Sequence, residues 1–225
     1  MRLGRWRPEN GWRGFSTDLI VVVLGVLIAL GAEQSIGWWR LQGEVNSLRS
    51  ALRDELSNNF ASYQYRLVQP RCVASRLAEL KTLRDRALAG EAAGVDGEIG
   101  RPSNASLRTS VWNARSSEVM DAMPLEQRLA YSSLYDELAF NFGLIDQERE
   151  AWRSLARFNG SRRLSREDAQ TLSELVWRAV KLDEALRYNR ADLEERFTQL
   201  GIGPSARMKQ FLGNDDGGLC TPLSH

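Results

Sequence analysis

The chain contains one unbroken apolar run of fourteen residues, Leu19 through Ala32, bounded by Asp18 and Glu33. At 1.5 Å per residue a helix of this length covers ~21 Å, less than the ~30 Å hydrocarbon core of a bilayer. A helix that crosses a membrane here therefore needs further residues on both sides of the run.

Aromatic and basic residues mark the two ends of such a span. Trp12 and Arg13 precede the apolar run, and Trp38 and Trp39 follow it. Indole rings and arginine side chains concentrate where a bilayer meets water, so these four residues are the expected interfacial anchors. The pattern predicts a transmembrane helix over residues 14–39, with the lipid bilayer around it.

Charge orients this helix. Residues 1–17 hold four arginines against one glutamate, whereas the remainder of the chain is close to neutral. Because basic flanks stay in the cytoplasm, we expect residues 1–13 to form a short basic cytoplasmic segment and the long C-terminal part to be exported. In a bacterium this places the helix in the inner membrane and the domain in the periplasm. A cleaved secretory signal is the alternative, since Ala29-Leu30-Gly31 offers small residues at the spacing that signal peptidase requires.

One face of the span suits contact with another helix. It carries Asp18, Val22, Gly25, Ala29, Ala32, Glu33 and Ile36. Small residues at this spacing let helices approach closely, and acidic residues near a membrane usually face protein or water. The functional interpretation is packing against another membrane protein or against itself. The alternative is that glycine and alanine are common in such helices and that both acids lie at the interface.

Beyond Arg40 apolar residues recur at steps of three and four, which is typical of helices that bury one face. The first such stripe runs from Leu41 to Leu67 with no proline before Pro70, so the membrane helix is predicted to continue into it. A second helix is expected after Pro70 and ends near Gly90. Its inward residues would be Val73, Leu77, Leu80 and Leu83.

Three more helices are predicted. A short one covers Leu107–Met120, and a long one runs from Pro124 to Phe158, where Gly160 is placed to stop it. The inward positions of the long helix would be Leu125, Leu129, Leu134, Leu138, Phe142, Ile145, Trp152 and Leu155. Ser165 with Asp168 resembles a capping box that opens a last helix, which keeps a seven-residue apolar period until Gly201.

These elements predict an all-α fold, in which one N-terminal transmembrane helix continues into an antiparallel helical bundle. We expect the bundle to cover residues 40–203 and residues 204–225 to form an irregular C-terminal tail. The chain has only two cysteines, Cys72 and Cys220, and an exported domain meets an oxidising compartment. An even count near loops predicts one disulfide that pins the tail to the bundle. Two free thiols are the alternative if the domain is cytoplasmic.

Composition argues against several functions. The 30 basic and 29 acidic residues nearly cancel, so the basic field that nucleic-acid binding requires is missing. The single histidine is the last residue, His225, which nearly excludes histidine-based catalysis. The sequence motifs of metal, haem, nucleotide and serine-hydrolase sites do not occur. We expect no catalytic residues, no cofactor, no metal and no enzymatic activity.

One polar and aromatic segment is a candidate docking surface, namely Trp112, Asn113 and Arg115. Indole and guanidinium groups are common at protein interfaces. The alternative is that Trp112 belongs to the core and the polar residues cap neighbouring helices.

The span DLIVVVLGVLIALGAEQ, the following Trp38-Trp39-Arg40, the segment LRSALRDELSNNF and Cys72 resemble a family of uncharacterised bacterial proteins. Its members have a single N-terminal inner-membrane helix and a helical periplasmic domain. The resemblance is good up to the second helix and implies the topology above, but it implies no activity.

Two functions remain as expectations. The first is a membrane-anchored, non-enzymatic adaptor or accessory subunit that serves as a scaffold in a larger membrane protein complex. The second is a periplasmic ligand-binding or sensory module, because helical bundles bind small molecules between their helices. An enzyme that uses carboxylates alone would need a deep pocket with converging acids.

Overall fold

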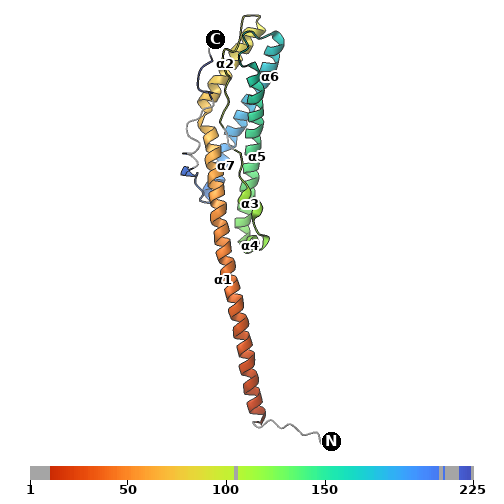
Figure 1. Ribbon diagram of the computed structural model, residues 1–225, viewed down its shortest axis with the longest axis vertical. Coiled ribbons are helices and arrows are strands. Elements are labelled where there is room, and N and C mark those ends of the chain that lie inside the picture. The colour runs from red at the N-terminus through yellow and green to blue at the C-terminus, as the bar shows by residue number, and fades with distance from the viewer. Residues whose placement is uncertain (1–10, 104–105, 208–209, 211–217, 224–225) are drawn as a thin grey trace, which may run out of the picture.

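The computed structural model describes residues 11–103, 106–207, 210 and 218–223. Its first helix, α1, runs from Gly11 to Val68 without a break, which at 1.5 Å per residue is a rod ~87 Å long. The lower part of α1 projects beyond all other helices (Figure 1), and its large apolar side chains from Leu19 to Ile36 are 47–70% exposed. We call residues 17–40 the apolar arm. The predicted continuation of this helix into the folded domain is confirmed.

Pro70 ends α1 as predicted. Helix α2 starts at Pro70 and ends at Leu88, because proline lacks an N–H group and is tolerated only in the first turn of a helix. The four inward residues predicted for α2, Val73, Leu77, Leu80 and Leu83, are all buried.

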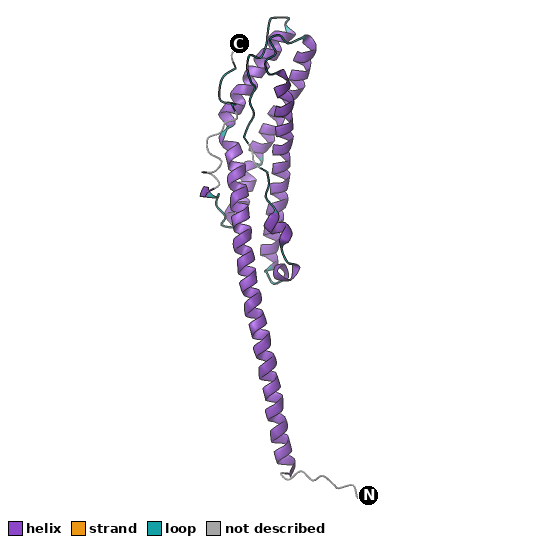
Figure 2. Cartoon of the chain, in the orientation of Figure 1, coloured by secondary structure: helices purple, strands orange, loops and turns teal. Residues whose placement is uncertain are grey.

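The remaining helices are α3 (Ser110–Ala114), α4 (Ser117–Asp121), α5 (Leu125–Leu155), α6 (Arg166–Tyr188) and α7 (Arg190–Gln199), with a 3-10 turn at Ala156–Phe158. Figure 1 shows that the upper half of α1, α2 and α5 run in one direction and that α6 and α7 return. Helix α6 packs against both α5 and α2. The helices in Figure 2 are joined by loops, and the regular elements of the described residues are all helices, so the predicted all-α fold is confirmed.

The bundle contains two apolar cores stacked along its length. The upper core joins α2, the end of α5 and the start of α6, and includes Leu80, Trp152 and Leu172. The lower core joins α1, the start of α5 and α7, and includes Leu56, Leu138 and Phe197. Burial of these side chains supplies most of the free energy of folding.

One predicted helix is replaced by two short ones. The expected helix over Leu107–Met120 is wrong, because α3 and α4 are separated by extended backbone at Arg115 and Ser116. The chain before α3 is also extended, since the Asn59 side chain donates to the Arg108 carbonyl at 2.7 Å and accepts from the Arg108 N–H at 2.9 Å. Both backbone groups of Arg108 are thereby diverted from helical hydrogen bonds.

Two inward positions predicted for α5 are wrong. Leu125 and Leu129 are each 59% exposed, whereas the other six predicted inward residues are buried. Since Tyr131 and Leu134 set the inward face, the helical period places Leu125 and Leu129 on the opposite side. The buried stripe of α5 therefore begins only at Tyr131, and the two apolar residues in its first turns do not belong to it.

The last predicted helix is also divided. It breaks at Asn189 into α6 and α7, where the Tyr63 hydroxyl donates to the Leu186 carbonyl at 2.8 Å. The Leu186 carbonyl thus accepts a hydrogen bond from a side chain close to the point where α6 ends. The capping box of Ser165 and Asp168 is confirmed. The two predicted stops are confirmed as well, because Gly160 and Gly201 have φ of +67° and +62°, which favours glycine.

Candidate functional site

The base of the bundle, where α3 and α4 lie beside α1, contains an open hollow of about 400 Å³. Its lining residues are Glu44, Leu48, Ser110, Val111, Ala114, Arg115, Ser116 and Val119. A smaller hollow of about 240 Å³ shares Glu44 and continues toward the apolar arm along Gly37, Arg40, Leu41 and Glu118. We call the two together the base groove. It joins the bundle to the part of α1 that carries Trp38 and Trp39.

The buried carboxylate of Glu55 fixes one wall of this groove. It accepts hydrogen bonds from the Val111 N–H at 2.8 Å, the Trp112 N–H at 3.2 Å, the Ser110 hydroxyl at 2.9 Å and the Tyr135 hydroxyl at 2.6 Å. Burial alone would raise the pKa of Glu55, but these four hydrogen bonds outweigh burial and hold the pKa below its usual value. Glu55 therefore ties α3 to α1 and α5 as a charged carboxylate.

The aromatic residue of α3 is packed inside this assembly. The Trp112 ring stacks on Tyr135, with centroids 4.5 Å apart, and the Arg115 guanidinium lies over the indole ring, 3.6 Å from its centroid. Arg115 also donates to the Trp112 carbonyl. Burial and the neighbouring Glu55 both raise the pKa of Tyr135, so its hydroxyl stays a donor.

The three residues predicted as a docking surface are thus in different settings. Trp112 is half-buried against the lower core. Asn113 is exposed and donates to the Thr109 hydroxyl at 3.0 Å, and Arg115 is half-buried and lines the base groove. Only Arg115 of the three borders a hollow that could receive a partner.

The residues predicted for the membrane segment lie on the apolar arm. Val22, Gly25, Ala29, Ala32, Glu33 and Ile36 are all exposed on α1, as are Trp38 and Trp39, whose rings meet edge to face with centroids 5.2 Å apart. Trp12, Arg13 and Asp18 fall within α1, but their side chains lie outside the described residues. By length and composition this is the one described helix able to cross a membrane.

A buried ion cluster lies where the two cores meet. Arg66 of α1 donates through Nε to Glu148 of α5 at 2.6 Å, and through Nη2 to Glu148 and to Asp183 of α6, the latter at 3.0 Å. Asp183 is also paired with Arg187 at 2.6 Å. Burial alone would lower the pKa of Arg66, but the two carboxylates outweigh it and raise the pKa. The cluster joins α1, α5 and α6.

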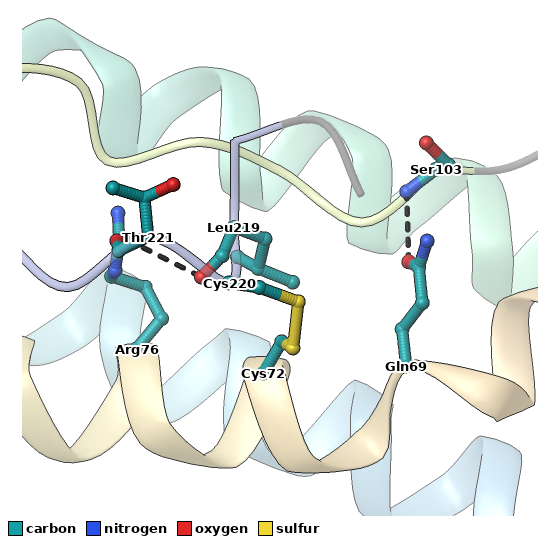
Figure 3. Close-up of a disulfide and its surroundings, with 7 residues drawn as sticks. All are labelled: Gln69, Cys72, Arg76, Ser103, Leu219, Cys220 and Thr221. Carbon is teal, nitrogen blue, oxygen red and sulfur yellow. Dashed lines mark hydrogen bonds between the residues drawn. A yellow bond between two sulfur atoms is a disulfide. The ribbon is translucent and has the colours of Figure 1, made fainter. Parts of the chain in front are cut away.

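The predicted Cys72–Cys220 disulfide is present, and Figure 3 shows it beside Arg76. Arg76 is buried and donates to backbone carbonyls of the tail, Leu219 at 3.3 Å and Thr221, and of the connection after α2, Glu98 at 3.0 Å and Ile99. Burial lowers the pKa of Arg76, and Glu79 at 2.9 Å partly offsets this. The disulfide and Arg76 thus fasten the tail to α2 together.

Among the described residues, no three His, Cys, Asp or Glu side chains are grouped so that they could hold a metal ion. The buried carboxylates at Glu55, Glu148 and Asp183 are each occupied by hydrogen bonds or ion pairs. These hydrogen bonds and ion pairs hold the helices in fixed positions relative to one another.

Comparison of the chain with protein family models, with curated proteins and with solved structures finds no match.

Proposed function

We propose that this protein is a membrane-anchored, non-enzymatic adaptor or accessory subunit of a larger membrane protein complex. The apolar arm crosses a bacterial inner membrane, residues 1–13 remain in the cytoplasm, and the bundle lies in the periplasm. The observation that carries this proposal is the continuity of α1, which is a single helix from the apolar arm to the lower core.

A continuous helix gives the bundle a fixed orientation to the bilayer. A secreted or loosely tethered domain would need no rigid connection, and a flexible link would let the bundle rotate freely. The base groove opens close above Trp38 and Trp39, so it faces whatever lies beside the arm at the membrane surface. The larger hollow is lined mainly by apolar groups and the smaller one by charged residues that include Arg40 and Glu118, and this mixture suits a protein segment better than an ion.

Purification of the tagged full chain tests the proposal. The protein is extracted from native membranes with a mild detergent, and the accompanying proteins are identified and quantified by mass spectrometry. The proposal predicts a stoichiometric membrane protein partner that is lost in Ala114→Trp, which fills the base groove. Ala191→Trp is the matched control, because Ala191 is also an exposed helical alanine but lies on α7 away from the groove.

A protein that emerges alone from wild-type membranes would contradict the adaptor. The ligand-binding module then becomes the function to test, by the change in melting temperature of the full chain with a library of small molecules. Orientation is tested separately with a membrane-impermeant thiol reagent on Ser50→Cys, which labels from the periplasmic side only if the bundle is exported.

A further inference from the structure

The smaller hollow of the base groove lies where the apolar arm meets the bundle. Its lining residues are Gly37, Arg40, Leu41 and Glu44 of α1 and Glu118 of α4. Figure 1 shows α4 at the lower end of the bundle, beside α1. Trp38 and Trp39 lie among these α1 residues, and tryptophans at the end of an apolar span mark the headgroup level of a bilayer. An arm that crosses the membrane therefore holds this hollow among the lipid headgroups.

The charged groups of this hollow are only partly paired. The Arg40 Nε donates to the Glu44 carboxylate at 3.0 Å, and 81% of the Arg40 side chain is exposed. Within the part of the chain that the structure describes, the two Nη groups of Arg40 and the carboxylate of Glu118 form no hydrogen bond or ion pair. The hollow therefore offers an occupant both guanidinium N–H donors and a carboxylate acceptor.

Charge and hydrogen-bond donors decide which headgroup suits the hollow. It holds one guanidinium and two carboxylates, and Glu33, one turn below Gly37 on the same side of α1, adds a third carboxylate. The other guanidinium of the base groove, that of Arg115, lines only the larger hollow and donates to the Trp112 carbonyl. A headgroup with a net negative charge would therefore be repelled. A choline headgroup has no N–H donor and is recognised by aromatic faces, which the lining residues do not supply, whereas a primary ammonium donates three hydrogen bonds.

We infer that the smaller hollow binds the headgroup of a zwitterionic phospholipid that carries a primary amine, the chemistry of phosphatidylethanolamine. The inference rests on the proposed membrane anchoring. The lipid phosphate accepts hydrogen bonds from the Arg40 guanidinium, whose planar fork suits phosphate oxygens, and the ammonium donates to the Glu118 carboxylate. The hollow of about 240 Å³ is smaller than the ~300–1,000 Å³ of pockets that enclose drug-sized ligands, so its size suits a headgroup.

The same side of α1 continues below the hollow as an apolar surface for the acyl chains. At the helical period of 3.6 residues, the apolar positions below Gly37 are Leu30, Val26, Val23 and Leu19, each 47–53% exposed. A side chain built at Gly37 would meet no atom within 4 Å, so this glycine keeps the passage from the hollow to the apolar surface open. A lipid held here would join α4 to α1 at the membrane surface, while the larger hollow stays open to a protein partner.

Lipid retention by the full chain tests this site. The tagged chain is reconstituted into liposomes with equal amounts of phosphatidylethanolamine, phosphatidylcholine and phosphatidylglycerol, extracted with a mild detergent, and analysed for bound lipids by native mass spectrometry. The expected result is retention of phosphatidylethanolamine about fivefold above either other lipid, and within about twofold of them in Glu118→Gln and Arg40→Gln. Glu126→Gln is the matched control, because Glu126 is also an exposed glutamate in the first turn of a helix but does not line the hollow.

Two further comparisons leave the bundle itself unchanged. Gly37→Leu fills the hollow from the arm and should abolish the preference, whereas Gly31→Leu, at an equally open position on another side of α1, should keep it. Successive N-methylation of the lipid amine should lower retention stepwise, because each methyl group replaces one N–H donor.

The outcomes that would overturn the lipid site differ from the outcome that would contradict the anchoring. Carbonate-resistant membrane association with equal retention of the three lipids, or with stronger retention of phosphatidylglycerol, would overturn the lipid site and leave the anchoring intact. Equal losses in Glu118→Gln and Glu126→Gln, or retention that does not change with N-methylation, would also overturn it. Release of the chain from membranes by carbonate would instead contradict the anchoring and the lipid site together.

Discussion

Arg66 of α1 and Glu148 of α5 form a bidentate ion pair in which neither side chain is exposed to solvent. Along α5 the neighbours of Glu148 belong to different cores, because Ile145 lies in the lower core and Trp152 in the upper core, and the upper core begins at Val73 on α2, just beyond the end of the helix that carries Arg66. The pair therefore fixes the axial register of α1 relative to α5. An apolar core alone would tolerate a sliding of one helix along the other more easily.

Removal of one partner of this pair should destabilise the protein strongly. Glu148→Gln leaves the Arg66 guanidinium buried with one fewer charge opposite, so the free energy of unfolding should fall by about 3–5 kcal/mol. Urea unfolding of the full chain in detergent, followed by circular dichroism, measures this. Glu150→Gln is the control, since Glu150 pairs with Arg153 at the surface and should change stability by less than about 0.5 kcal/mol. Equal effects of the two substitutions would contradict the assigned role.

The double substitution Arg66→Met with Glu148→Leu tests what the pair contributes beyond stability. Because apolar replacement removes both buried charges, it should recover most of the stability lost in Glu148→Gln. A double variant that is as unstable as the single one would show that the site requires the ion pair itself. Near-ultraviolet circular dichroism reports whether the packing around Trp152 stays fixed.

Glu55 should make stability depend on pH. Its pKa is lower in the folded protein than in the unfolded chain, so the folded state is favoured above the unfolded value of 4.5 and this contribution is lost as pH falls through the lower folded pKa. The gap in unfolding free energy between wild type and Glu55→Gln should be about 1–3 kcal/mol at pH 7 and should shrink below pH 4.5. A gap that stays constant between pH 6 and pH 3 would contradict this account of Glu55.

The tail should depend on the disulfide. Cys72→Ser, Cys220→Ser and the double variant should each lose about 2–5 kcal/mol of unfolding free energy, because the bond closes a loop of 148 residues in the unfolded chain. The two single losses should not add in the double variant, since each removes the same bond. Additive losses, measured by urea unfolding under non-reducing conditions, would show that the cysteines act separately.

Two glycines should respond in opposite directions to alanine. Gly160→Ala forces a side chain into a positive φ and should destabilise the turn after α5 by about 1 kcal/mol. Gly143→Ala lies inside α5 with open space around the added carbon, so it should stabilise the helix by about 0.5–1 kcal/mol. Melting temperatures of the full chain in detergent provide the comparison, and shifts of the same sign would contradict the local geometry described here.

The sequence predicts the helices well where one face is continuously apolar. The run from Leu41 to Leu67, the break at Pro70 and the stops at Gly160 and Gly201 follow from periodicity and backbone chemistry alone. The divisions at Arg115 and at Asn189 could not be predicted, because each depends on a side chain distant in sequence. Asn59 and Glu55 form hydrogen bonds beside the division at Arg115, and Tyr63 forms one beside the division at Asn189.

The polar contacts that hold the helices of the bundle together were not predicted, because they also join residues distant in sequence. Arg66 and Glu148 occupy helical positions that face inward, next to Tyr63 and Ile145, and a charged residue within an apolar stripe is the signal that could have revealed them. Arg76 is different, since its partners are carbonyl groups of the tail and of an extended connection. Every residue has a backbone carbonyl, so the sequence does not show which carbonyl groups accept these hydrogen bonds.

Continuity of α1 connects the proposed membrane span to the bundle and fixes the direction in which the base groove faces. Spin labels at Ser35→Cys and Ser50→Cys, both exposed on α1, report this directly by electron–electron distance measurement in liposomes, with excess unlabelled protein to suppress distances between copies. The account predicts one narrow distribution centred near the ~22 Å that fifteen residues of straight helix cover, widened only by the label arms. A broad or divided distribution would place a hinge at the membrane surface and contradict it.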